Sequence, residues 1–222
     1  YTPLYTLSLH DALPICTLDD TARRLGAVNT IKVTPAGLRG YNTDGPGFYR
    51  SLVEDLGFEP ENKNVCILGA GGAAMAVIMY LGNGPKTIFV SDIDPAKTAA
   101  VAAQYGTFFD AKKLVVVPQG GLPGALAESE LLVNATPVGM KATDPAPVDT
   151  ALLHQGLYVY DLVYNLPQTT LVRDAVRMKR HAVTGLGMLL RQGAIAFELW
   201  TDRKAPVAAM KKALKEACSG SH

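Results

Sequence analysis

The stretch VCILGAGGAA, from Val65 to Ala74, decides the fold of this chain. Its first four residues, Val65–Leu68, are all apolar, which is typical of a short strand buried on both faces. Gly69 follows directly and begins a G-x-G-x-x-A turn that leads into a helix of small residues, predicted over Ala73–Leu81. A strand, a glycine turn and a helix in this order predict the first unit of a parallel sheet covered by helices.

The glycine turn has the spacing that binds the phosphates of a dinucleotide. Gly69 permits the tight turn, Gly71 lets a pyrophosphate approach the backbone, and Ala74 allows close packing of the helix on the strand. The phosphates would accept hydrogen bonds from the unpaired N–H groups at the helix start. A purely structural glycine turn is the alternative, but the strand before it and the helix after it favour the binding function.

An acidic residue completes this pattern. Asp92 ends the predicted strand Thr87–Ser91, about 20 residues after the turn, where a carboxylate can accept both ribose hydroxyls of NAD. A 2′-phosphate would be repelled there, and the nearest basic residue is Lys97, one turn into the next helix. Asp94 is the better N-cap for that helix, predicted over Pro95–Tyr105, which leaves Asp92 free for the ribose. The residues alone therefore favour NAD over NADP.

Short apolar runs continue to alternate with helical segments along the chain. Further strands are predicted over Leu114–Val117, Leu131–Asn134, Leu157–Leu162 and Ala182–Thr184. The last predicted elements are two helices, Leu186–Trp200 and Val207–Ala217. This alternation predicts an α/β fold with a doubly wound parallel sheet of the Rossmann type.

A separate group of elements precedes this sheet. A helix is predicted over Asp19–Leu25, and two strands, Val28–Val33 and Leu38–Asn42, are joined by a Thr-Pro-Ala-Gly turn. Asp44 is expected to cap a helix over Gly47–Leu56. We expect these elements to form part of a second unit.

The composition excludes several classes of function. The 222 residues carry a formal net charge of +1, which leaves no basic surplus for nucleic acid or an anionic membrane. No apolar run approaches the ~18 residues of a membrane span. Cys16, Cys66 and Cys218 are widely spaced and match neither a disulfide framework nor a metal site. The composition therefore predicts a cytoplasmic protein without a bound metal.

Five further stretches resemble the shikimate dehydrogenase family, which includes the quinate/shikimate dehydrogenases, in their order and spacing. They are GAVNT (Gly26–Thr30), GYNTDG (Gly40–Gly45), NATPVGM (Asn134–Met140), YDLVY (Tyr160–Tyr164) and GLGMLLRQ (Gly185–Gln192). The resemblance runs from about Cys16 to His222. It implies reversible hydride transfer between NADPH or NADH and the ketone of 3-dehydroshikimate, which yields shikimate in chorismate and aromatic amino-acid biosynthesis.

The resemblance also implies roles for single residues. Asp44 matches the partner of a catalytic lysine. The positions that match contacts with the substrate are Asn29, Asp44, Tyr164 and Gln192. The positions that match the turn at the cofactor pyrophosphate are Gly69, Ala70, Gly71, Gly72 and Ala73. The positions where the family holds the nicotinamide half are Thr136, Leu162 and Gly185. The implied partner is a small-molecule substrate, bound to a monomer or a homodimer.

The resemblance divides the chain into four parts. Residues 16–46 are expected to be a remnant of an N-terminal α/β substrate-binding domain, and residues 47–185 the NAD(P)-binding Rossmann domain. Residues 186–222 are expected to form helices that pack back toward the substrate domain. Residues 1–15 are expected to be a leader foreign to the family, because Thr6–Ile15 resembles a translated sequencing adapter.

Two departures from the family bear on activity. NADP-using members carry an Asn-Arg-Thr stretch where this chain has Ser91–Asp94, which is closer to NAD-using relatives. The family's catalytic lysine lies upstream of Asn29, and the segment Tyr1–Ile31 contains no lysine and no Ser-x-Ser pair for the substrate carboxylate. We therefore expect an N-terminally truncated dehydrogenase with impaired turnover. An NAD-dependent quinate/shikimate dehydrogenase and a non-catalytic dinucleotide-binding protein are the alternatives.

Overall fold

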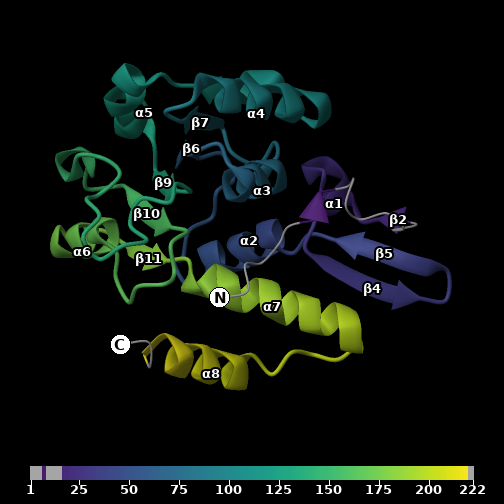
Figure 1. Ribbon diagram of the computed structural model, residues 1–222. Coiled ribbons are helices and arrows are strands. Elements are labelled where there is room, and N and C mark those ends of the chain that lie inside the picture. Colours follow the sequence, from purple (N-terminus) through teal and green to yellow (C-terminus); the bar gives the residue numbers. More distant parts are fainter. Residues whose placement is uncertain (1–6, 9–16, 220–222) are drawn as a thin grey trace.

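The computed structural model describes residues 7–8 and 17–219, and its largest element is a six-stranded parallel sheet (Figure 1). The strands lie in the order β11-β10-β9-β6-β7-β8, and every neighbouring pair is parallel. Their bounds are β6 (Asn64–Leu68), β7 (Thr87–Ser91), β8 (Leu114–Val116), β9 (Leu131–Asn134), β10 (Tyr158–Asp161) and β11 (Ala182–Thr184). The chain first builds outward from β6 to β8 and then reverses to β9, so a crevice opens beyond the carboxyl ends of β6 and β9.

Helices cover both faces of this sheet. They are α3 (Gly72–Leu81) and α4 (Pro95–Phe108) on one face, and α5 (Leu122–Glu128) and α6 (Thr170–Arg177) on the other. Val65 and Ile67 of β6 point into the core beneath α3, whereas Cys66 and Leu68 point into the core beneath α5 and α6. All four are buried, which explains the uninterrupted apolar run. The predicted doubly wound fold is confirmed.

A smaller sheet lies beside the first. β2 (Thr17–Leu18) pairs in parallel with β5 (Gly37–Tyr41), which pairs antiparallel with β4 (Thr30–Thr34). Along the chain, α1 (Asp20–Leu25) and β3 (Ala27–Val28) follow β2 and precede β4. β3 pairs antiparallel with β1 (Leu7–Ser8). Asp19 caps α1, because its carboxylate accepts a hydrogen bond from Ala22 N at 2.8 Å. The rest of the predicted leader lies outside the described residues.

The prediction of one strand over Val28–Val33 is wrong, because the strand is interrupted at Asn29 between β3 and β4. Asn29 Oδ1 accepts hydrogen bonds from Thr43 N and from Thr30 Oγ1, both at 3.0 Å. The Asn29 N–H donates to the carbonyl of Tyr41 at 3.0 Å. The asparagine therefore ties the small sheet to the start of the next helix.

That helix, α2 (Asp44–Glu54), begins earlier than the predicted Gly47, and the prediction that Asp44 caps it is wrong. Thr43 holds the N-cap position, and Asn42 Oδ1 accepts a hydrogen bond from the Asp44 N–H at 3.1 Å. Asp44 is consequently a residue of the first turn, with its carboxylate free of a capping role. The predicted division after residue 46 falls inside this helix.

α7 (Leu186–Thr201) returns from the large sheet and packs along α2 (Figure 1). Glycines let the two backbones approach closely. A Cβ atom on Gly47 would lie 2.8 Å from Gln192 N, and one on Gly187 would lie 2.1 Å from Ser51 Oγ. α8 (Val207–Ser219) then packs on α7.

The remaining elements are short. The part of the chain that the structure describes includes 3₁₀ helices at Ala111–Lys113, Gln119–Gly121 and Thr150–Leu152. These, and the helices α5 and α6, were not predicted from the sequence, whereas the predicted strands and helices of the large sheet are confirmed with small shifts at their ends. Among the helices that the structure describes, none has the length and apolar character needed to cross a bilayer.

Candidate active site

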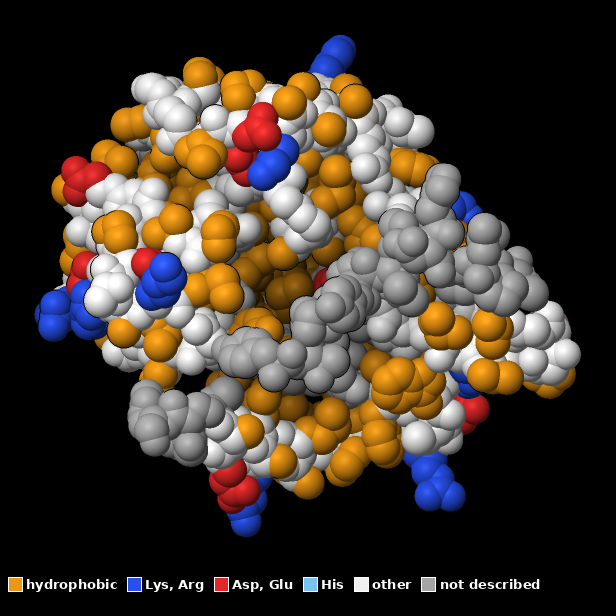
Figure 2. Space-filling view, in the orientation of Figure 1, with side chains coloured by type: hydrophobic (Ala, Val, Ile, Leu, Met, Phe, Trp, Pro, Cys, Tyr) orange, Lys and Arg blue, Asp and Glu red, His pale blue; other side chains and the backbone are white. Residues whose placement is uncertain are grey.

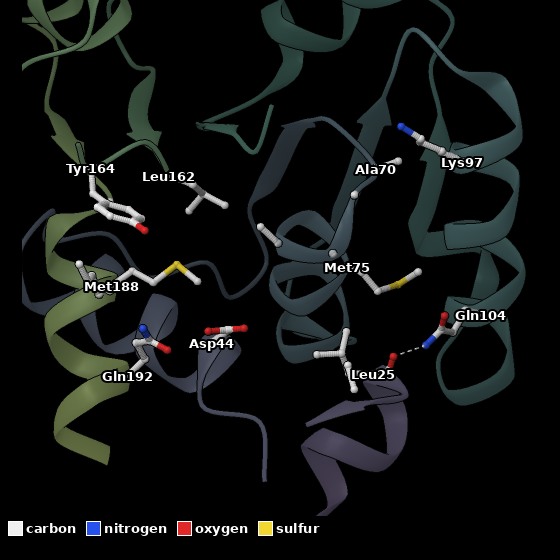
Figure 3. A pocket seen from close by; sticks show the side chains of 16 residues that line it. Leu25, Asp44, Ala70, Met75, Lys97, Gln104, Leu162, Tyr164, Met188 and Gln192 are labelled. Atoms are coloured by element: carbon white, nitrogen blue, oxygen red, sulfur yellow. Dashed lines mark hydrogen bonds between the residues drawn. The ribbon is translucent and has the colours of Figure 1, made fainter. Parts of the chain in front are cut away.

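A cavity of about 550 Å³ lies where the carboxyl edge of the large sheet faces α2 and α7. Figure 2 shows a hollow near the centre of the molecule with hydrophobic side chains in its depth. Its walls include the turn Ala70–Ala73, Asp44 of α2, and Met188 and Gln192 of α7. Figure 3 shows Asp44, Met188 and Gln192 on one side of the cavity and Lys97 on the other. Both units of the fold therefore contribute to one site.

The glycine turn has the geometry that phosphate binding requires. Gly69 has a φ of +95°, and a Cβ there would lie 2.9 Å from the carbonyl oxygen of Ala135, so a side chain is excluded. Gly71 and Gly72 instead face open space, with no atom within 4 Å of a built Cβ. No side chain caps the start of α3 at Gly71, so its first N–H groups are available to an anion. The residues present fit a dinucleotide pyrophosphate.

Asp92 and Lys97 bear on the choice between NAD and NADP, and only one of them lines the cavity. Asp92 is not among the residues that line the cavity, and its carboxylate accepts hydrogen bonds from Ala70 N at 2.8 Å and Asp94 N at 2.9 Å. Lys97 does line the cavity. Asp94 caps α4 as predicted, since its carboxylate accepts from Ala96 N at 2.9 Å. Because a carboxylate has about four acceptor sites, Asp92 retains capacity for a ribose.

Asp44 is the half-buried acid of the site. Burial raises the pKa of its carboxyl above the ordinary value, and a hydrogen bond from Asn29 partly offsets this effect. Asn29 does not line the cavity, so it affects the site through its hydrogen bond to the Asp44 side chain. The protonated carboxyl is thereby favoured relative to an exposed aspartate, and it can donate as well as accept a hydrogen bond.

The other predicted substrate residues also face the cavity. Gln192 lies on α7 and Tyr164 follows β10, where its side chain is partly exposed. Gly185, at the start of α7, lines the same space, and a Cβ there would lie 2.1 Å from the carbonyl oxygen of Leu162. Only glycine can therefore hold α7 this close to the end of β10.

A second cavity of about 370 Å³ lies against the same glycine turn. Thr136 lines this cavity and not the first one, whereas Leu162 and Tyr164 line both. Gly71, Gly72 and Ala73 also line both cavities. A cofactor bound at the turn could thus extend from one cavity into the other.

Several residues of the site were not predicted from the sequence. Met75 and Met188 provide apolar walls, and Gln104 closes one end of the cavity. The Gln104 amide donates hydrogen bonds to the carbonyls of Arg24 at 2.7 Å and Leu25 at 3.1 Å, which connects α4 to α1 (Figure 3). The available signal was the spacing of Lys97 and Gln104, two helical turns apart on one face of α4.

Potential metal ligands do not gather in the part of the chain that the structure describes. No group of three or more His, Cys, Asp or Glu side chains there could hold an ion. Cys66 is buried in the sheet, where burial raises the pKa of its thiol to about 12.

Comparisons with known proteins bear on the class to which this chain belongs. A family model described as the shikimate 5′-dehydrogenase C-terminal domain matches residues 185–215. A shikimate dehydrogenase (NADP(+)) from Moorella thermoacetica is 41% identical over 207 residues, which are 92% of this chain and 70% of that protein. Shikimate 5-dehydrogenase from Listeria monocytogenes, in complex with shikimate and NAD, matches with a TM-score of 0.85 and 31% identity, over 96% of this chain and 75% of that one.

Quinate dehydrogenase from Corynebacterium glutamicum, in complex with NAD, matches with a TM-score of 0.84 and 29% identity, over 91% of this chain and 72% of that one. The fold, the site and these similarities define the class: the protein is an NAD(P)-dependent oxidoreductase. The identity to the Moorella protein extends across both units of the fold. The chain belongs to the shikimate dehydrogenase family.

Proposed function

We propose that this chain binds NADP(H) or NAD(H) at the turn Gly69–Ala73 and interconverts 3-dehydroshikimate and shikimate. The observation that carries this proposal is that the glycine turn and the half-buried Asp44 line one cavity. When bound, the nicotinamide supplies or accepts the hydride. We further propose a cytoplasmic monomer or homodimer, in keeping with the absence of a basic surplus and of a membrane-spanning helix among the described residues.

The substrate half of the site suits a cyclic polyol. Vicinal hydroxyls need rigid groups that can both donate and accept, and the Gln192 amide and the Asp44 carboxyl are such groups. Reduction of the ketone builds negative charge on its oxygen, which a nearby acid must neutralise. Asp44, whose pKa is raised by burial, holds a proton more readily than an exposed aspartate. Met75 and Met188 add apolar walls to the same space.

We also propose that turnover is low. In the family a lysine partners the position of Asp44, and the segment Tyr1–Ile31 contains none. Loss of a general acid typically lowers a rate ~10²–10⁴-fold. Cofactor binding depends on the glycine turn and should be retained.

The test separates binding from turnover. Cofactor binding is measured by titration with NADPH and with NADH, with nicotinamide fluorescence as the signal. Turnover is measured by the rate of shikimate oxidation. Gly71→Ala should weaken cofactor binding about tenfold, since its Cβ would occupy the space of the pyrophosphate. Gly120→Ala is the control, because its Cβ also meets no atom within 4 Å but lies outside the cavity. No binding by the wild type, or equal effects of both variants, would contradict the proposal.

NAD-dependent oxidation of quinate is the second candidate. Asp92 favours it, because a carboxylate after the second strand suits an unphosphorylated ribose. A ratio of kcat/KM for quinate over shikimate above one, with NAD, would establish this activity. Binding of cofactor with no turnover of either substrate would instead favour a non-catalytic dinucleotide-binding protein.

A further inference from the structure

A buried carboxylate stands at the end of β10, next to the second cavity. Asp161 has no exposed surface, and its Oδ1 accepts hydrogen bonds from Asn134 Nδ2 at 2.8 Å and Val163 N at 3.1 Å. Its Oδ2 accepts from the hydroxyl of Thr169 at 2.6 Å. All three donors are neutral, and no ion pair involves Asp161 among the described residues.

These partners join two loops that follow neighbouring strands. Asn134 ends β9, and its Oδ1 accepts from the N–H and the hydroxyl of Thr136 at 3.1 and 2.7 Å. Its Nδ2 also donates to the carbonyl of Val138 at 3.0 Å. Thr169 lies at the end of the loop after β10 and caps α6 through Val172 N at 3.2 Å. Asp161 is therefore the common acceptor between the loop after β9 and the loop after β10.

Further contacts support the same junction. The Asn165 amide donates to the carbonyl of Met140 at 2.7 Å, and the Thr170 hydroxyl donates to the carbonyl of Asp144 at 2.9 Å. Gly139 has a φ of +107°, and a Cβ there would lie 3.7 Å from Asp161 Oδ2. The two loops thus hold a single relative position along their length.

The second cavity lies between these loops and the glycine turn. Thr136, Pro137 and Met140 line it from the loop after β9, and Leu162 and Tyr164 line it from the loop after β10. We propose that Asp161 is a positioning residue that sets the spacing of these two walls and so orients the nicotinamide half of the cofactor. The inference rests on the proposed function, since it requires a nicotinamide cofactor at the glycine turn.

A merely structural role would be filled more cheaply by an apolar side chain. A buried carboxylate is costly unless its lone pairs are satisfied, and apolar residues of similar volume often replace buried charged groups without loss of stability. A carboxylate can, however, accept from three donors at once, here one on β9 and two in the loop after β10. We therefore expect that replacing Asp161 displaces the two walls around the nicotinamide half of the cofactor and leaves binding of the other half unchanged.

The experiment compares a whole cofactor with a fragment that lacks the nicotinamide ring. The probes are NADPH with 2′-phospho-ADP-ribose, and NADH with ADP-ribose, each titrated into the full chain by calorimetry. In Asp161→Asn one carboxylate oxygen becomes an NH2 donor, so either the Asn134 amide or the Thr169 hydroxyl loses its acceptor and the link between the loops is weakened. The Kd of the whole cofactor should rise about tenfold, while the Kd of the fragment should stay within about twofold.

Asp149→Asn is the matched control, since Asp149 caps a 3₁₀ helix outside both cavities and should change neither Kd. If Asp161→Asn does not fold, Thr169→Val removes one donor with little change in shape, and Thr169→Ser should restore binding. Equal weakening of whole cofactor and fragment, or no weakening, overturns the inference. If the wild type binds neither molecule of either pair, the proposed function itself fails, and this inference fails with it.

Discussion

The hydroxyl of Tyr160 on β10 donates a hydrogen bond of 2.7 Å to Ser51 Oγ on α2, and both residues are buried. Ser51 in turn donates to Asp55 Oδ2 at 2.8 Å, and Arg191 of α7 binds Asp55 Oδ1 at 3.0 Å. This series of contacts joins the large sheet to the helix that carries Asp44. It fixes the walls of the cavity that α2 and α7 provide relative to the carboxyl edge of the large sheet.

Removing the first of these hydrogen bonds should loosen that connection. Tyr160→Phe deletes the hydroxyl, which removes the donor to Ser51 and the acceptor of the Met188 N–H, while Ser51 keeps its bond to Asp55. We expect a loss of about 0.5–1.5 kcal/mol in the free energy of unfolding. Urea unfolding measures this value, and Tyr80→Phe, at a partly exposed ring, is the control expected to be neutral. Equal losses in both variants would contradict the role assigned to Tyr160.

The contact between α2 and α7 should tolerate no side chain at Gly187. An alanine Cβ there would lie 2.1 Å from Ser51 Oγ and 2.4 Å from Asp55 Oδ2, which forces the helices apart. We expect Gly187→Ala to destabilise the fold by about 1–3 kcal/mol. Gly193→Ala, on the same helix, meets only Met210 Cε at 3.7 Å and should gain about 0.5–1 kcal/mol from helix propensity. A stable Gly187→Ala variant would show that the helices can separate freely.

Asp44 should make the stability of the protein depend on pH. Its folded pKa is raised above the ordinary 3.8 by burial, so its contribution to stability is full below about that pH and is lost as the pH rises through the folded pKa. Asp44→Asn should therefore be more stable than the wild type at pH 7 and have a higher Tm.

The gain of Asp44→Asn should shrink as the pH falls, because the raised pKa lets the wild-type carboxyl take up a proton at a higher pH than an exposed aspartate. Calorimetric scans between pH 4 and pH 7 check this prediction. Asp20→Asn, at an exposed position on α1, is the control for a change of net charge. A Tm difference that is constant over this range would rule out burial of Asp44 as its cause.

Cofactor choice should depend on Asp92 and Lys97 in opposite directions. Lys97→Ala should raise the Kd of NADPH about threefold, the effect of losing an exposed ion pair worth ~0.6 kcal/mol. The Kd of NADH should not change. Asp92→Asn should shift preference toward NADPH, because it removes a charge that repels the 2′-phosphate. The ratio of the two Kd values is the measurement, with Asp110→Asn, a cap outside the cavity, as control. An unchanged ratio in both variants would assign cofactor choice to other residues.

Local patterns in the sequence predicted the large sheet well, and contacts between distant segments explain what they missed. β6 and β9 are apolar throughout because both faces are covered, and such runs are recognisable without knowledge of their neighbours. The break between β3 and β4 at Asn29 depends on a hydrogen bond from Thr43 N. The parallel pairing of β2 with β5 depends on the course of the chain through α1, β3 and β4, which lie between these two strands in the sequence. Neither is encoded in the residues next to it.

The same distinction applies to the site. The glycine turn was predicted because its function requires a fixed local spacing. The partners of Asp161 were not, since Asn134 lies on another strand and meets it only through the register of β9 with β10. Likewise Gln104 gains its role only when α1 packs against α4.

The pairing of α2 with α7 also has a consequence for synthesis on the ribosome. Phe48 and Leu52 of α2 are fully buried in the finished fold, yet nearly the whole nucleotide-binding sheet is translated before α7 emerges. At about 5–20 residues per second, this interval is on the order of ten seconds. During that time the apolar face of α2 lacks part of its cover, so nascent chains stalled before Leu186 should be the species that chaperones bind most strongly.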